Sequence, residues 1–343
     1  VELSACNDYK TVVWIKFIIC SGFIVVTGAS LSRYGDVIAE KSGIGKAWIG
    51  LVLMASITSL PELITGVSAV AMVGSLDIAY GSIMGSCVFN LFILALLDPM
   101  SGVKPIFQRA GKGHLLSALF GMVLIVIASL AVIISDFTPS FFQISIVTPV
   151  IVLIYGYSIK ILYDYEKKVI VEFVDDVAEK IKYKDFTLKR ALIMYGINAT
   201  LVVVAASFLP FIADEISEVT GLGGTFVGSA FVALATSLPE VVISIAAVKI
   251  GALDMAVANM FGSNMFNILI LGIDDIVYRG GTLYSGVATS HAVTGFMAIL
   301  MTLVAVIALA YRADRHVFLR FGWASSVMIV IGIINFVVLF LMR

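Results

Sequence analysis

The stretch that decides the fold is Thr58-Ser59-Leu60-Pro61-Glu62, which the chain repeats as Thr236-Ser237-Leu238-Pro239-Glu240. Each copy places one carboxylate and two hydroxyls inside a long apolar segment. A glutamate at membrane depth costs several kcal/mol unless it is paired, hydrated or bound to a cation, so such a residue is a functional candidate by default. Glu62 and Glu240 are therefore the first candidate site residues.

The composition is that of a membrane protein. Of the 343 residues, 60% are hydrophobic and 13% are charged, whereas a soluble domain has about 25% charged residues. The formal net charge is only −1, so we expect no nucleic-acid partner. The three cysteines have no spacing that indicates a disulfide framework or a metal site.

Ten apolar runs predict ten transmembrane helices, because about 20 apolar residues cross a hydrocarbon core about 30 Å thick. The first run is too long, and too closely tied to the repeat, to be a cleavable signal peptide. The expected fold is an all-α polytopic membrane protein with five spans on either side of one polar interval. The predicted spans are 11–34, 46–74, 77–98, 113–135, 141–163, 189–214, 225–249, 253–277, 287–311 and 316–342.

Similarity between the two halves extends beyond the pentapeptide, since Gly85-Ser86-Cys87-Val88-Phe89-Asn90 is matched by Gly262-Ser263-Asn264-Met265-Phe266-Asn267. Because each half has an odd number of spans, the second half must enter the membrane from the opposite side. This predicts inverted repeats related by a pseudo-two-fold axis in the membrane plane. The expected parts are a first five-helix repeat at 1–163, a linker at 164–188 and a second five-helix repeat at 189–343.

The basic residues predict the orientation. Most of them lie in the connections after the first, third, fifth and ninth spans, and few lie on the other face. By the positive-inside rule, the face with more Lys and Arg is cytoplasmic. We therefore expect a cytoplasmic linker and both termini on the extracellular or lumenal side.

The proline in each pentapeptide should interrupt its helix. Pro61 has no N–H and clashes with the carbonyl four residues before it, that of Ile57. Pro239 has the same relation to Ala235. Freed carbonyls at membrane depth persist where they line a cavity, so we expect a cavity beside each motif.

Further polar side chains share helix faces with one another. Thr58 and Glu62 are four residues apart, and Ser86 with Asn90 and Ser263 with Asn267 have the same spacing. Together these groups form an all-oxygen set of the kind Ca²⁺ prefers, with enough members for its usual ligand number of about 6–8. No imidazole or thiolate cluster favours zinc or copper. Two glutamates neutralise one divalent ion, and two protons or several Na⁺ can replace it, as an exchanger requires.

At these residues the chain resembles the calcium/cation antiporter superfamily. Its two TSLPE motifs, each followed by GS-x-x-x-N, are similar to the two alpha repeats of the sodium/calcium exchanger branch. The resemblance implies alternating access, in which the first and sixth spans slide across the remaining bundle. It also implies cation ligands at Glu62, Glu240, Thr58, Ser59, Thr236, Ser237, Ser86, Ser263, Asn90 and Asn267, and at the carbonyls of Ala55 and Ala233.

Two departures from that pattern bear on the counter-ion. Ile57 and Ala235 stand where this branch usually has glycine, and some sodium/calcium exchangers have an aspartate at one of the positions of Asn90 and Asn267. The site then has two ionisable groups, which two protons satisfy as readily as several Na⁺. The GN-x-x-E motif that is typical of the proton-coupled branch is absent from the sequence. We therefore expect Ca²⁺ to be exchanged for either Na⁺ or H⁺.

Other function classes fit less well. A passive cation channel is the alternative, and flux without any counter-ion would favour it. Two carboxylates without a base should repel anionic solutes, and no Ser/His or aspartate pair within the spans indicates an enzyme. We expect a monomer in the lipid bilayer with no resident cofactor, Asp77 and Asp254 as helix N-caps, and no proton relay through His114, His291 or His316.

Overall fold

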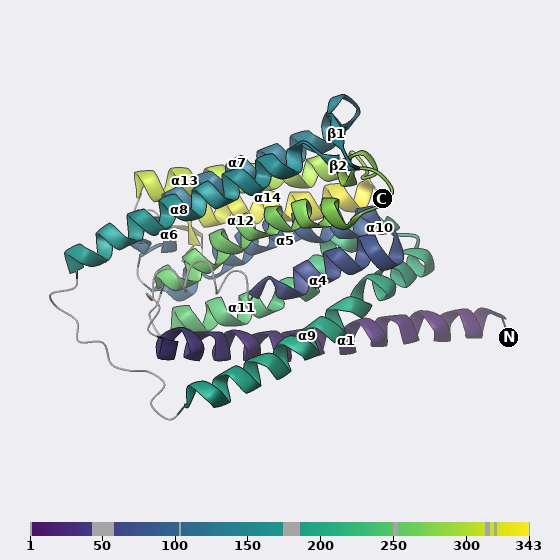
Figure 1. Cartoon of the computed structure of the whole chain (residues 1–343), viewed down its shortest axis with the longest axis horizontal. Helices are drawn as coiled ribbons and strands as arrows, with labels where there is room; N and C mark the ends of the chain where they lie inside the picture. Colours follow the sequence, from purple (N-terminus) through teal and green to yellow (C-terminus); the bar gives the residue numbers. More distant parts are fainter. Residues whose placement is uncertain are drawn as a thin grey trace.

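A computed structural model describes residues 2–42, 58–102, 104–173, 186–249, 253–312, 316–318 and 321–342. Nine helices within these ranges are long and apolar enough to cross a membrane, and the shorter apolar stretch Leu60–Val73 accompanies them. The prediction of an all-α polytopic membrane protein is therefore confirmed. In Figure 1, α1 begins and α14 ends at one end of the bundle, which we call the terminal end, whereas α8 ends and α9 begins at the opposite, linker end.

The order of elements follows the predicted spans closely. In the first half, the elements are α1 (Glu2–Ser42), α4 (Leu60–Ser68), the π-helical η2 (Ala69–Val73), α5 (Leu76–Leu96), η3 (Asp98–Ser101), α6 (Ile106–Arg109), α7 (His114–Ile133), η4 (Ser135–Phe137), β1 (Ser140–Phe141), β2 (Ile144–Ser145) and α8 (Val147–Phe173). In the second half, they are α9 (Leu188–Thr220), α10 (Gly223–Phe226), the π-helical η5 (Val227–Val232), α11 (Ala233–Lys249), α12 (Leu253–Val277), η6 (Leu283–Ser285), α13 (His291–Tyr311), β3 (His316–Phe318), β4 (Phe321–Gly322) and α14 (Trp323–Leu341).

Several predicted boundaries were wrong. Helix α1 has 41 residues and is about 60 Å long, so it extends beyond the predicted span 11–34 at both ends. The spans predicted to start at 141 and 316 start instead at Val147 and Trp323, because short antiparallel hairpins precede both helices. Helix α8 continues to Phe173, into the predicted linker 164–188. Residues 46–57 of the second predicted span lie outside the described residues.

Helices α1 and α9 lie side by side along one face of the bundle (Figure 1). Lys16 Nζ of α1 is 2.7 Å from Glu215 Oε2 of α9, and the Cys20 thiol donates to the carbonyl of Ala205. The most deeply buried long helices are α5 and α12, which pack against each other in the interior. This arrangement separates an α1–α9 pair from a bundle built around α5 and α12.

Glycine allows the closest helix approach in the interior. A Cβ on Gly85 of α5 would overlap the backbone of Ser229 in η5. We expect Gly85→Val to reduce stability by about 1–3 kcal/mol, the usual cost of overpacking, and to lower the thermal unfolding midpoint of the purified protein. Gly156→Val is the matched control, because a Cβ on that α8 residue would meet no atom within 4 Å from the other described elements. Equal midpoints for the two variants would contradict this account of the packing.

Two aspartates, Asp98 and Asp275, join loops from different halves of the chain. Each accepts one amide hydrogen bond from a residue eight positions later and one from the hairpin of the other half. The bonds to Asp98 come from Ile106 N and Gly322 N, both at 2.6 Å, and those to Asp275 from Leu283 N at 2.7 Å and Ser145 N at 2.9 Å. The same 177 positions separate Asp98 from Asp275, Ile106 from Leu283 and Ser145 from Gly322, as two repeats would predict.

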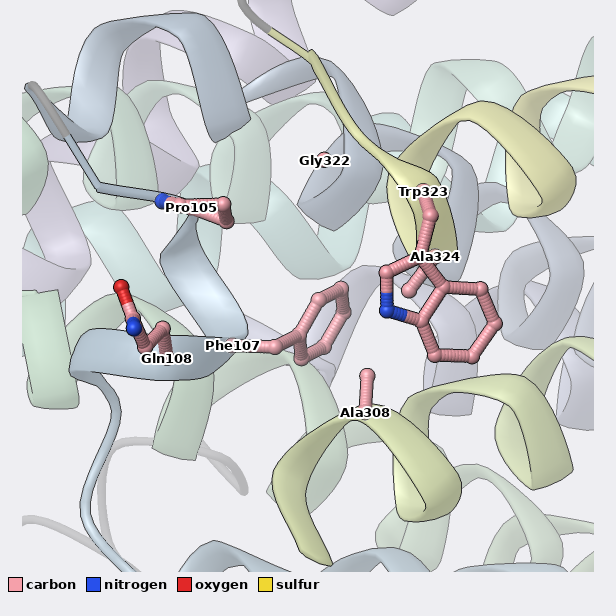
Figure 2. Close-up of a pocket in the computed structure, with 7 residues that line it drawn as sticks. All are labelled: Pro105, Phe107, Gln108, Ala308, Gly322, Trp323 and Ala324. Carbon is pink, nitrogen blue, oxygen red and sulfur yellow. The ribbon is translucent and has the colours of Figure 1, made fainter. Parts of the chain in front are cut away.

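A small pocket lies beside the Asp98 junction, where α6, α13 and α14 meet. Figure 2 shows the ring of Phe107 pointing toward Ala308 and Trp323 within this pocket. Its lining is mainly apolar, and the β3–β4 hairpin beside it belongs to the linker end of the bundle. The pocket contains neither of the candidate glutamates.

Candidate cation site

The two candidate glutamates lie on different helices, Glu62 on α4 and Glu240 on α11, and each is bonded to the motif of the other half. Ser237 Oγ donates to Glu62 Oε1 at 3.1 Å, and Ser59 Oγ donates to Glu240 Oε1 at 3.3 Å. Both glutamates are almost fully buried, with exposures of 1% and 0%. The two pentapeptides therefore form one cluster with crossed serine–glutamate contacts.

Hydroxyls from α5 and α12 complete this cluster. Ser86 Oγ lies 2.9 Å from Ser237 Oγ, and Ser263 Oγ lies 3.4 Å from Thr58 Oγ1. A hydroxyl has a single hydrogen to donate. Ser237 Oγ is placed to donate to both Glu62 Oε1 and Ser86 Oγ, so its one hydrogen is shared between these two acceptors or alternates between them.

The backbone around the second motif differs from the prediction. Helix α11 runs from Ala233 to Lys249 without a break at Pro239, and the irregular turn is the π-helical η5 just before it. Thr236 Oγ1 donates to the carbonyls of Val232 and Ala233 at 3.1 and 3.3 Å. The carbonyl oxygen of Ala233, which was predicted to be a cation ligand, therefore accepts a hydrogen bond in this structure. In the first motif, Pro61 lies in the first turn of α4, as a helix-starting proline does. Ala55 lies outside the described residues.

One of the two predicted asparagines, Asn90, is held by a residue that sequence reasoning missed. Asn90 Nδ2 donates to Asn264 Oδ1 at 3.0 Å, and Asn264 Nδ2 donates to the carbonyl of Cys87 at 3.1 Å. Asn264 thus fixes which way the amide of Asn90 points. The available signal was its position inside GSNMFN, where the first half has Cys87.

Several buried oxygens of the cluster have no hydrogen-bond partner among the described residues. They are Glu62 Oε2, Glu240 Oε2, Asn90 Oδ1 and Asn267 Oδ1. Buried polar atoms normally have partners, so unpartnered ones need an explanation such as an ion or a water. This set contains only carboxylate and amide oxygens, the ligands of a hard cation.

No basic side chain in the described part of the chain pairs with the carboxylates of the cluster. Among the described ranges, ion pairs join Lys16 to Glu215, His114 to Asp254 and His291 to Asp77, and none involves the two candidate glutamates. Unpaired carboxylates at this depth are costly. A bound cation or protons must therefore offset their charge.

The prediction for Asp77 and Asp254 as simple N-caps was wrong. Asp77 Oδ1 accepts from Ala288 N at 2.8 Å and lies 3.1 Å from His291 Nε2, and Asp254 Oδ1 has matching contacts with Gly111 N at 2.6 Å and His114 Nε2 at 2.9 Å. Both contacts join a helix start to a loop far away in the sequence. The histidines therefore fasten the bundle at two places outside the glutamate cluster.

In a comparison with known proteins, one family model matches most of the chain. Residues 12–163 and 190–342 match the model of the family described as sodium/calcium exchanger protein. A putative antiporter, CaxA, of Alkalimonas amylolytica is 25% identical over 270 residues, which cover 77% of this chain and 81% of that protein. The sodium/calcium exchanger MaX1 of Methanosarcina acetivorans is 24% identical over 291 residues, covering 75% and 80%.

Solved structures share the fold. The sodium-calcium exchanger NCX_Mj, soaked with 2.5 mM Na⁺ and 10 mM Sr²⁺, superposes with a TM-score of 0.62 at 20% identity, covering 95% of this chain and 98% of that one. Native YfkE gives a TM-score of 0.65 at 16% identity, covering 95% and 91%. At these identities the likeness concerns the arrangement of helices.

Proposed function

Because the chain belongs to the sodium/calcium exchanger protein family, we propose that it is a secondary active antiporter that exchanges Ca²⁺ for Na⁺ or H⁺ by alternating access. The observation that supports this most is the crossed cluster, in which Ser237 bonds to Glu62 and Ser59 bonds to Glu240. Each carboxylate keeps a buried oxygen, Oε2, without a partner in the described part of the chain. Two such oxygens in one cluster suit a divalent cation.

We propose that the ligands come from both motifs and from α5 and α12. The two glutamates neutralise Ca²⁺, and hydroxyl and amide oxygens supply the rest of the coordination of about 6–8 oxygens. Replacing the Ca²⁺ by protons or Na⁺ on the same groups keeps the buried charge neutral. The ligands proposed beside Glu62 and Glu240 are Thr58, Ser59, Thr236, Ser237, Ser86, Ser263, Asn90 and Asn267, with the carbonyls of Ala55 and Ala233.

The halves of the chain are proposed to be inverted repeats. Contacts that recur at matching positions support this, since 177 positions separate Asp77 from Asp254 and also His114 from His291. One chain contains both halves of the site, so a monomer suffices for transport. The excess of basic residues on the linker side supports a cytoplasmic linker and termini on the extracellular or lumenal side.

Helices α1 and α9 are proposed to move as a pair across the bundle. A Cβ on Gly28 of α1 would lie 2.7 Å from Pro239 Cγ of α11, so α1 passes directly over the second motif. We expect Gly28→Leu to slow Ca²⁺ exchange about tenfold, because a side chain there costs about 1–3 kcal/mol when it must pass Pro239. The measurement is the initial rate of Ca²⁺ uptake by proteoliposomes.

Gly22→Leu is the control for this variant, because a Cβ on Gly22 of the same helix would meet no atom within 4 Å from the other elements that the structure describes. Both variants should elute as single species in size-exclusion chromatography. If Gly28→Leu and Gly22→Leu transport at equal rates, α1 does not move over Pro239 during exchange.

The test of the function is Ca²⁺ uptake into proteoliposomes, driven in separate experiments by a Na⁺ gradient and by a pH gradient. We expect uptake with at least one gradient and none without either. The gradient that drives uptake identifies the counter-ion. Equal Ca²⁺ flux with and without a counter-ion would instead indicate a passive cation channel.

A further inference from the structure

Asp274 is a buried carboxylate that the proposed exchange site does not use. It lies near the C-terminal end of α12 with an exposure of 0%, and neither of its oxygens has a hydrogen-bond partner among the residues described. Its neighbour Asp275 is equally buried but accepts bonds from Ser145, Thr148 and Leu283. Asp275 therefore has a structural role, because it joins loops and a helix by hydrogen bonds. The side chain of Asp274 makes no such bonds to described residues.

The carboxylate of Asp274 points at α4. A Cβ on Gly66 would lie 2.5 Å from Asp274 Oδ2 and 2.9 Å from Oδ1, so glycine at this position makes room for the carboxylate. Gly66 follows Glu62 by four residues, and Asp274 follows Asn267 by seven, so each shares a helix face with a residue of the cluster. Seven residues of α-helix are about 10 Å long. Asp274 thus lies about 10 Å further along α12 than Asn267, and Figure 1 shows that α12 ends toward the terminal end of the bundle.

The pair formed by Gly66 and Asp274 has no counterpart at the matching positions of the other half. At the spacing of 178 that relates Glu62 to Glu240, Gly66 corresponds to Ser244. At the spacing of 177 that relates Asn90 to Asn267, Asp274 corresponds to Leu97. An uncharged leucine therefore stands at the equivalent position of Asp274, which shows that the architecture itself does not need a carboxylate there.

No base among the described residues forms an ion pair with Asp274. The titratable side chains toward this end of α12 and of the elements packed on it are Glu62, Asp77, Tyr80, Tyr155, Tyr284 and Asp275, with Tyr278 and Arg279 just after α12. Arg279, the base in this set, is exposed to solvent and forms no ion pair with Asp274, and His291, which approaches from α13, is bonded to Asp77. In the described structure Asp274 thus has acidic neighbours and no ion pair.

Which ligand the Asp274 carboxylate can bind depends on the number of other oxygens around it. A metal ion such as Na⁺ or Ca²⁺ needs several oxygen ligands, but neither carboxylate oxygen of Asp274 has a hydrogen-bond partner among the described residues. An ionised carboxylate without any partner is far more costly to bury than a neutral group with one unmade hydrogen bond, so a buried carboxyl in this position takes up a proton.

We propose that Asp274 is a proton-binding site, a third ionisable position beside the two glutamates. Loss of its proton requires water to reach the carboxylate, and therefore separation of α4 from α12 at Gly66. The protonation of Asp274 is thereby linked to the packing of the helix that contains Glu62. The assignment of Asp274 as a proton-binding site depends on the groups around this carboxyl alone. Only its part in transport rests on the proposed Ca²⁺ exchange.

Infrared spectroscopy of the purified protein tests this inference without Ca²⁺ or any gradient. The background is Glu62→Gln/Glu240→Gln, which removes the protonated carboxyls of the cluster. At neutral pH we expect a C=O stretching band of a protonated carboxyl in this background. Adding Asp274→Asn should remove one such band, and adding Asp136→Asn, at an exposed residue of η4, should leave it.

Asp274→Leu is the second variant, in case the asparagine variant does not fold, because it installs the residue that the first half has at this position. Loss of the band in either variant supports the proton site. An absent band in the background, or an equal band with and without Asp274, would overturn it. Failure of Ca²⁺ exchange is detected separately, in the proteoliposome experiment.

Discussion

Replacing either Glu62 or Glu240 with glutamine is expected to abolish Ca²⁺ exchange. The substitution keeps the shape of the side chain and removes one of two negative charges in a cluster without a basic partner in the described structure. Removing one partner from a buried charge pair typically costs about 3–5 kcal/mol, which corresponds to a loss of Ca²⁺ affinity of at least about a hundredfold. The measurement is Ca²⁺ uptake by proteoliposomes that contain each variant.

The control is Glu218→Gln, at an exposed position near the C-terminal end of α9. It makes the same chemical change outside the cluster and should leave uptake near that of the unmodified protein. Near-normal exchange by either Glu62→Gln or Glu240→Gln would show that the site lies elsewhere.

The second large effect is expected from the crossed serines. Ser59→Ala removes the hydrogen bond to Glu240, and Ser237→Ala removes the bonds to Glu62 and Ser86. A hydrogen bond to a charged group contributes about 1.5–3 kcal/mol. Each single variant should therefore bind Ca²⁺ roughly tenfold more weakly, and the double variant should be weaker than either.

Calorimetric titration with Ca²⁺ measures these affinities. Ser82→Ala is the matched control, because Ser82 is buried on α5 and its one hydrogen bond to a described residue goes to the carbonyl of Ala79 in its own helix. Comparable losses for Ser59→Ala and Ser237→Ala are expected from a symmetric site. A loss confined to one of the two serines would contradict the crossed arrangement.

Much of the fold could be predicted from hydrophobic length, because a membrane restricts helices to a narrow range of lengths. The errors occur where that rule does not apply. Residues 141–145 are apolar enough to extend a span, yet Phe142 and Gln143 adopt positive φ and close a hairpin. Pro239 should break a helix by local rules, but α11 continues through it while η5 takes up the irregularity.

The members of the candidate cluster could be named from the sequence, since the repeated motif and the i, i+4 spacing identify helix faces. Their pairing could not. Whether Ser237 meets Glu62 or Glu240 depends on how α4 packs against α11, which no local pattern encodes. The same applies to Asn264, whose partner Asn90 lies 174 residues away, and to Asp274, whose isolation depends on the glycine it faces on α4.

The central claim is that the two motifs form one Ca²⁺ site for which the counter-ion competes. Calorimetric titration of the purified chain with Ca²⁺, repeated at increasing Na⁺ concentration and at decreasing pH, tests it most directly. We predict one Ca²⁺ per chain, with an apparent affinity that falls as Na⁺ or H⁺ rises and binding that disappears in Glu62→Gln/Glu240→Gln. Binding that survives in this double variant, or that neither Na⁺ nor H⁺ weakens, would contradict the account.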